Sequence, residues 1–177
     1  MMTSNKPINS PADLAGLKVR IGSAKLIADL ITTLGANPTP IAMSETYTAL
    51  QTGTVDAQEN PTTNIISNKL YEVQDYLAIT RHQYVTQPLV MNKAKFESLS
   101  PEFQQILLEA GAEAAAADVT AVKDSEAAQI EELKAAGMNV TEPDPAAFKD
   151  ALQKLYDDYS SQNGEEWDKL IELIGQI

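Results

Sequence analysis

The chain has 177 residues, which suits one compact domain or slightly more. Its 13 basic and 25 acidic residues give a net charge of −12, which argues against nucleic acid or an anionic membrane surface as a partner. Cysteine is absent and His82 is the only histidine, so disulfides, thiol catalysis and a two-histidine metal site within one chain are excluded.

Two kinds of targeting segment are missing from the sequence. No stretch approaches the ~20 consecutive apolar residues of a membrane-spanning helix. Residues 1–9 have neither the basic start nor the apolar centre of a signal peptide. We therefore expect either a cytoplasmic protein or one whose targeting segment is not in this chain.

The first half of the chain, residues 1–92, alternates short apolar runs with short helical patterns. The expected strands are residues 17–21, 39–43, 55–59, 77–82 and 88–91, and the expected helices cover about residues 23–34 and 44–53. Asn60 and Pro61 are expected to be the N-cap and first residue of another helix. Strands separated by short helices imply parallel pairing, so we expect an α/β fold with a mostly parallel sheet and flanking helices.

The second half is nearly all helical in pattern. One long helix is expected to begin at Pro101 and to end near Gly137, and at 1.5 Å per residue it would be about 50 Å long. A helix of that length should bridge two bodies or bend. A short strand around Val140 and a helix from Pro145 are expected to follow. A last helix after Gly164 is expected to bury Trp167, Leu170, Ile171 and Ile174.

Candidate binding residues lie where the expected parallel strands end, because ligands bind beyond the carboxyl ends of such strands. These residues are Arg20, Met43, Asn60 and His82. A guanidinium matches a carboxylate bidentately, an asparagine amide adds a donor and an acceptor, and the helix from Pro61 would add N–H groups. The set suits a small anionic molecule, and no nucleophile elbow, P-loop or zinc-protease motif is present.

Each of these residues also has an interpretation that needs no ligand. Arg20 could be a solvated charge at the end of a strand. Asn60 could serve only as a helix N-cap. His82 could be a surface or core histidine. From the pattern alone these alternatives stay open.

Longer motifs resemble a known family. They are PINSPADLAGLKVR (7–20), GANPTP (35–40), YTALQTG (47–53) and VDAQENP (55–61), followed by YEVQ (71–74), TRH (80–82) and LSP (99–101). In this order they resemble the solute-binding proteins of tripartite ATP-independent periplasmic (TRAP) transporters, beginning where the second lobe of those proteins opens. The resemblance covers essentially the whole chain.

The resemblance implies a periplasmic-binding-protein-like lobe from a two-lobed receptor that closes on a small organic acid and delivers it to a membrane permease. Such a receptor is periplasmic, has no cofactor and is not an enzyme. Arg20 would hold the ligand carboxylate and Asn60 would be the ligand-binding asparagine. The residues that line the pocket in some relatives fall at Ser23, Ala24, Met43 and His82. The sequence departs from the family at Gly22, Ala57 and Met43, where the usual residues are a proline, a glycine and an aromatic.

The resemblance also implies a domain layout. Residues 1–85 and 126–177 would form the second ligand-binding lobe. Residues 86–125, a strand and part of the long helix, would cross into a first lobe that is largely missing from this chain. An open strand at 88–91 and an exposed apolar stripe on the long helix would favour a homodimer.

Two rival functions are considered beside the receptor. One is a stand-alone helical interaction module without transport function, whose partner binding would depend on Leu107 and Ala114 rather than on Arg20. The other is an enzyme that uses His82 and a carboxylate, which a single histidine and the lack of a recognisable nucleophile make remote.

Overall fold

The computed structural model describes residues 1–85 and 87–174, with the side chains of the last helix described as far as residue 173. The described residues divide into two compact units. The sheet unit comprises Met1–His82 and Leu133–Ile177, and the helical unit comprises Gln83–Glu132. The assignment of these units to the lobes of a receptor stays a prediction.

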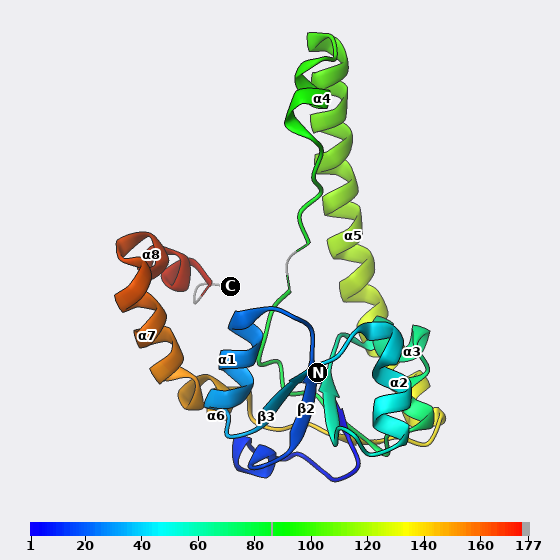
Figure 1. The fold of residues 1–177 in the computed structure, drawn as a ribbon. Coiled ribbons are helices and arrows are strands. Elements are labelled where there is room, and N and C mark those ends of the chain that lie inside the picture. The colour runs from blue at the N-terminus through cyan, green and yellow to red at the C-terminus, as the bar shows by residue number, and fades with distance from the viewer. Residues whose placement is uncertain (86, 175–177) are drawn as a thin grey trace. The chain divides into compact units, whose positions relative to one another are not determined.

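One mixed sheet organises the sheet unit (Figure 1), and its strand order is β3-β2-β4-β1-β5-β6. The strands are β1 (Met2–Ser4), β2 (Lys18–Ile21), β3 (Asn37–Pro40), β4 (Ala57–Glu59), β5 (Tyr76–Ala78) and β6 (Asn139–Thr141). Strand β1 is antiparallel to both β4 and β5, whereas β2–β3, β2–β4 and β5–β6 are parallel pairs. Five strands therefore point the same way, which confirms the predicted α/β class with a mostly parallel sheet.

Short helices flank this sheet. They are α1 (Lys25–Thr33), α2 (Met43–Gln51), α3 (Thr62–Ser67), α6 (Pro145–Ala151), α7 (Gln153–Asn163) and α8 (Glu165–Ile174), with 3-10 turns η1 (Pro11–Leu14) and η2 (Leu70–Glu72). Helix α1 buries Leu30 and Ile31 and is followed by Gly35 at a φ of 86°, a left-handed conformation that glycine adopts without strain.

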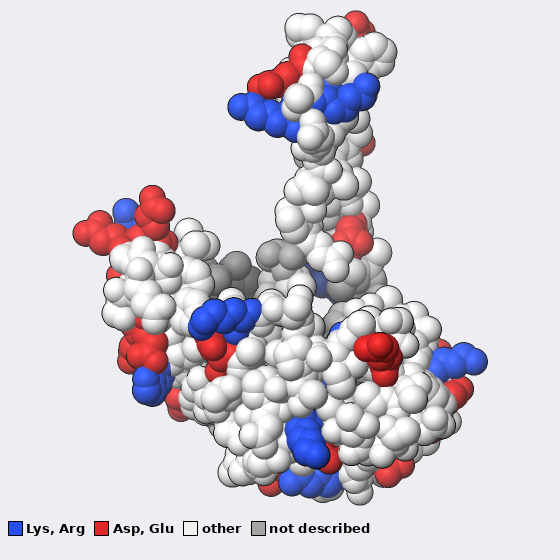
Figure 2. Space-filling model, in the orientation of Figure 1, with Lys and Arg blue, Asp and Glu red and all other residues white. Residues whose placement is uncertain are grey.

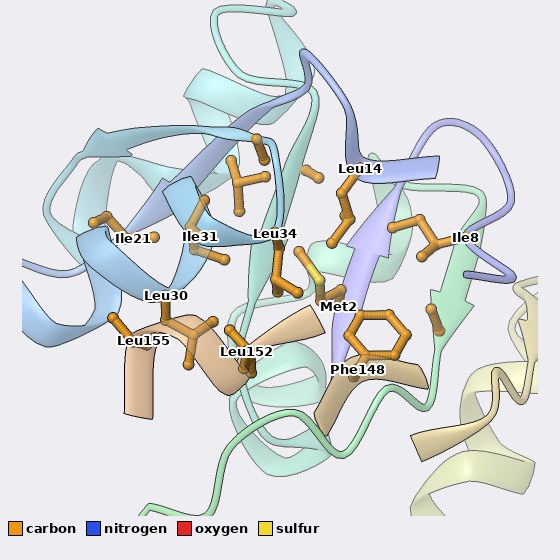
Figure 3. Packing of buried hydrophobic residues seen from close by; sticks show 14 residues of the cluster. Met2, Ile8, Leu14, Ile21, Leu30, Ile31, Leu34, Phe148, Leu152 and Leu155 are labelled. Atoms are coloured by element: carbon orange, nitrogen blue, oxygen red, sulfur yellow. The ribbon is translucent and has the colours of Figure 1, made fainter. Parts of the chain in front are cut away.

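The hydrophobic core lies between the sheet and helices α1, α6 and α7 (Figure 3). Met2 from the sheet, Ile31 from α1, and Phe148 and Leu152 from the α6 region are all almost completely buried. Burying a side chain of this size stabilises the fold by about 1.5–3 kcal/mol. This core holds the sheet rigid, so the loops at its carboxyl edge are positioned by a stable scaffold.

The helical unit contains α4 (Lys93–Glu97) and most of α5 (Pro101–Ala135). Helix α5 has 35 residues and is therefore about 52 Å long. It begins at Pro101 as predicted, and its residue Leu133 is completely buried in the sheet unit. The helix ends at Ala135, so the prediction of one long helix is confirmed, whereas its crossing between two lobes stays a prediction. In the described part of the chain, no helix is both long and apolar enough to cross a bilayer.

The predicted strand at residues 88–91 is wrong. Residues 87–92 have no strand structure, and Leu89 and Val90 are 81% and 80% exposed. The apolar run satisfies the sequence pattern of a strand, but no neighbouring strand is present in the described chain to pair with its backbone.

The predicted strand at 39–43 also ends too late. Strand β3 stops at Pro40, and Met43 is the first residue of α2, with Ala42 as the N-cap instead of Ser44. Strand β5 likewise ends at Ala78, so the predicted strand 77–82 begins one residue late and extends too far.

The last helix is less buried than predicted. Trp167 stacks on Tyr159 of α7, with ring centroids 5.4 Å apart, but Leu170 and Leu173 are 52% and 59% exposed. Helix α8 packs on α7 along one side, so its other apolar residues stay uncovered within the described chain. The predicted burial of Ile174 concerns a side chain outside the described ones.

Candidate ligand-binding site

Arg20 lies on β2 and is only 6% exposed. Its Nε donates a hydrogen bond to the backbone carbonyl of Ile41, at 2.9 Å, which fixes the direction of the side chain. Burial lowers the pKa of Arg20 from its usual range, and the Glu59 carboxylate raises it again. An arginine remains charged at pH 7 even so. The interpretation of Arg20 as a solvated strand-end charge is therefore wrong.

Asn60 follows β4 directly and is half-buried. Its Nδ2 donates to Oε1 of Gln58 at 2.6 Å, and its Oδ1 accepts a hydrogen bond from Nδ2 of Asn64 at 2.9 Å. The N-cap of α3 is Pro61, and its first residue is Thr62. The prediction that Asn60 caps this helix is wrong, because its side chain is committed to the two neighbouring amides.

Arg20 and Asn60 are linked through the residue between them. Strands β2 and β4 are parallel neighbours, and Arg20 is paired in register with Gln58. Residues opposite each other on adjacent strands share a face of the sheet, and residues two apart on one strand do so as well. Arg20, Gln58 and Asn60 therefore lie on one face at the carboxyl end of two adjacent strands.

Met43 joins this group from α2. Its Sδ lies 3.9 Å from Nδ2 of Asn60, and the side chain is half-buried. Ser23 and Ala24 lie in the loop between β2 and α1, where both are exposed and Ala24 is the N-cap of α1. Within the described chain, the Ser23 hydroxyl makes no hydrogen bond to Arg20 or Asn60, so the structure brings together Arg20, Asn60 and Met43 but leaves the loop apart.

His82 lies beyond the end of β5, which is separated from β4 by β1. It is buried, its Nδ1 is 2.5 Å from the Thr80 hydroxyl, and its ring lies 6.4 Å from that of Phe148. Burial lowers the pKa of His82 to about 3, so the imidazole is neutral at pH 7. Its Nε2 has no hydrogen-bond partner among the described residues. His82 thus occupies the predicted edge of the sheet but is not joined to Arg20 or Asn60.

Two residues that contact Asn60 were not predicted from the sequence. Gln58 is completely buried on β4, and Asn64 is one turn into α3. The signal for Gln58 was its position two residues before Asn60 on a strand, which places both on one face.

An open hollow of about 440 Å³ lies beside α2 and is lined by Ile41, Ser44, Glu45, Thr48, Ala49, Thr52 and Thr54. None of the predicted site residues lines it, so we assign no ligand to it. Residues 1–85 and 87–174 also contain no cluster of three acidic or histidine side chains that could hold a metal ion.

Comparison with known proteins gives consistent matches. Residues 1–163 match the family model for bacterial extracellular solute-binding protein, family 7. The chain is 38% identical over 175 residues to the 2,3-diketo-L-gulonate-binding periplasmic protein of Escherichia coli, covering 98% of this chain and 53% of that protein. It is 40% identical over 163 residues to the sialic acid-binding periplasmic protein of Vibrio cholerae, covering 92% and 51%.

A solved structure agrees with these matches. A TRAP periplasmic solute-binding protein from a Sulfitobacter species, with bound β-D-galacturonate, superposes with a TM-score of 0.88 at 34% identity. The superposition covers 97% of this chain and 57% of that one. The chain spans about half the length of the curated relatives it matches.

Proposed function

Since the chain belongs to family 7 of the bacterial extracellular solute-binding proteins, the receptors of TRAP transporters, we propose that it binds a small organic acid through an ion pair between Arg20 and the ligand carboxylate. The relatives above are named as binding proteins, and none of them as an enzyme. The family is periplasmic. We place this chain there too and propose delivery of its ligand to a membrane permease.

The observation that carries this proposal is the buried, unpaired charge of Arg20. Only its Nε has a partner in the described chain, the Ile41 carbonyl, and no described carboxylate lies within ion-pair distance. The Glu59 carboxylate acts on Arg20 only from beyond ion-pair distance, so the buried charge is only partly compensated, and a ligand carboxylate would complete the compensation. The outer guanidinium nitrogens offer the planar fork that a carboxylate fits.

The ligand class follows from the same chemistry and from the relatives. The ligands in their names, diketogulonate, sialic acid and galacturonate, each combine one carboxylate with several oxygen groups. We propose a ligand of this kind, with its carboxylate on Arg20 and an oxygen acceptor on the Asn60 N–H that faces only the weakly accepting Met43 sulfur. Ser23, Ala24, Met43 and His82 are proposed to line the rest of the pocket.

Titration of the isotope-labelled chain with D-galacturonate, followed by amide NMR, tests the proposal even at millimolar affinity. Arg20→Lys keeps the charge but loses the fork, so binding should weaken at least about tenfold. Arg81→Lys is the matched control, because Arg81 is the other of the two arginines and is exposed. D-galactose, which lacks the carboxylate, should not bind. Unchanged affinity in Arg20→Lys, or no response of the unsubstituted chain to D-galacturonate, would overturn the proposal.

A further partner is a second copy of the chain. Helix α5 exposes Phe103 and Leu107, which are 60% and 43% exposed and lie one turn apart on one face. Farther along α5, Figure 2 shows a mostly uncharged surface on the side turned to the viewer. We propose self-association of the chain through this face. The interaction-module alternative is not favoured, because the matched family consists of solute-binding proteins.

A further inference from the structure

We propose that Gln58 is the positioning residue that determines which way round the Asn60 side-chain amide faces the ligand. The proposal deepens the function proposed above and rests on Asn60 being a ligand contact. Gln58 is completely buried and is the acceptor for Asn60 Nδ2, at 2.6 Å. It therefore acts on the ligand only through Asn60.

Asn60 belongs to a continuous line of side-chain hydrogen bonds across the sheet. Gln58 Nε2 donates to the Thr3 hydroxyl at 3.0 Å, and this hydroxyl donates to Gln74 Oε1 at 3.3 Å. Gln74 Nε2 then donates to Asn5 Oδ1 at 2.9 Å. Thr3 and Gln74 are buried, at 0% and 2% exposed. The line thus runs from Asn60 at the rim of the sheet through buried side chains to Asn5, which is exposed.

Each residue in this line donates to the next one, from Asn60 towards Asn5, and a backbone group fixes that direction. Gln74 Nε2 also donates to the carbonyl of Val73 at 3.1 Å, and a carbonyl can only accept. The Nε2 end of Gln74 must therefore face Val73, which leaves its Oε1 facing Thr3. The Thr3 hydroxyl must then donate to Gln74 and accept from Gln58.

The same logic continues to Asn60. Because Gln58 presents Nε2 to Thr3, its Oε1 faces Asn60, so Asn60 must present Nδ2 to Gln58. Asn64 Nδ2 completes the arrangement by donating to Asn60 Oδ1 at 2.9 Å. The second N–H of Asn60 faces the Met43 sulfur, a weak acceptor, at 3.9 Å, so the N–H side and the oxygen side of this amide are each held in a fixed place. Turning the amide over would exchange the two, so a ligand oxygen would meet an acceptor where it now meets a donor.

Two substitutions test this arrangement. Gln58→Met removes the hydrogen bonds to Thr3 and Asn60 while keeping a similar volume. Thr3→Val removes the hydroxyl through which the orientation of the Gln74 amide fixes that of Gln58. Thr46→Val is the matched control: Thr46 is also completely buried, and its hydroxyl donates to the Ala42 carbonyl, outside the line. The control therefore loses one buried hydrogen bond without touching Asn60.

The first measurement is made on the ligand-free chain. We expect slow hydrogen exchange of the Asn60 side-chain amide in the unsubstituted chain and in Thr46→Val. We expect fast exchange in Gln58→Met and two amide populations in Thr3→Val. Should Gln58→Met fail to fold, Thr3→Val still decides the matter. Asn60 signals that respond equally to Thr3→Val and Thr46→Val would overturn the proposal.

The second measurement is the D-galacturonate titration. Affinity should fall about tenfold in Gln58→Met and less in Thr3→Val, and should be unchanged in Thr46→Val. Lost affinity in all three variants would show a merely structural effect and would overturn the proposal. If the unsubstituted chain does not bind the acid, the proposed function fails, whereas the exchange measurement still decides whether Gln58 positions Asn60.

Discussion

The hydroxyl of Tyr159 donates a hydrogen bond to Oδ2 of Asp29, at 2.8 Å, across 130 residues of sequence. This contact joins α7 to α1, and Lys25 also pairs with the same carboxylate. Tyr159 stacks on Trp167, the only tryptophan of the chain. Tryptophan fluorescence therefore reports on the packing of helices α7 and α8 against α1.

The first prediction concerns the ionisation of Asp29. The hydrogen bonds from Lys25 and then from Tyr159 lower the pKa of Asp29 below its usual range. Tyr159→Phe should raise this pKa towards the usual value, as measured by carboxyl NMR titration. A lowered carboxyl pKa stabilises the fold at neutral pH, and this stabilisation is lost as the pH falls through the folded-state pKa. Tyr156→Phe, on the same helix, should leave Asp29 unchanged. An unchanged pKa in Tyr159→Phe would contradict the contact.

The second prediction concerns the core. Phe148 is 1% exposed and lies beside Met2 (Figure 3). Phe148→Ala should lower the free energy of unfolding of the sheet unit by about 3–5 kcal/mol, since it removes buried surface and leaves a cavity. Phe103→Ala, at a position that is 60% exposed, should change it by no more than about 0.5 kcal/mol. Urea unfolding followed by tryptophan fluorescence measures both, and equal effects would place Phe148 outside the core.

The third prediction concerns His82. Burial lowers its pKa to about 3, whereas an unfolded histidine titrates near 6.5. The folded state thus takes up fewer protons than the unfolded state between these values, so stability falls as the pH drops below about 6.5. Over this range, the His82→Asn variant should lose less stability than the unsubstituted chain, and the difference should be up to about 1.4 kcal/mol for each pH unit. Because His82 is the only histidine, NMR titration of its ring gives the pKa directly. A pKa near 6.5 would contradict its burial.

Part of the site could be predicted from the sequence because strand ends are marked by clear patterns. The alternation at residues 17–21 and the Gln-Glu-Asn-Pro run at 58–61 place Arg20 and Asn60 at the ends of two parallel strands, and the structure adds that these strands are neighbours. The pattern could not give the partners of Asn60, because side-chain hydrogen bonds depend on register and on rotamers as well as on strand position.

Strand β1 could not be predicted. Its three residues, Met2–Ser4, include two polar ones, so they show no apolar alternation. Thr3 is buried because Gln58 and Gln74, distant in sequence, satisfy its hydroxyl. Residues 88–91 are the opposite case, since their local pattern is that of a strand but no partner strand exists in the described chain. In both cases tertiary pairing, which the local sequence does not contain, decides the outcome.

The fourth prediction concerns self-association through α5. Light scattering over a dilution series should show a mass that falls with concentration, because burial of Phe103 and Leu107 between two copies removes apolar surface from water. Leu107→Glu should shift the chain to monomer, since a carboxylate on this face would be buried. Ala112→Glu adds the same charge on roughly the opposite side of the helix, where it should have no effect. A constant monomer mass at every concentration, or equal effects of the two substitutions, would show that this face does not join two copies.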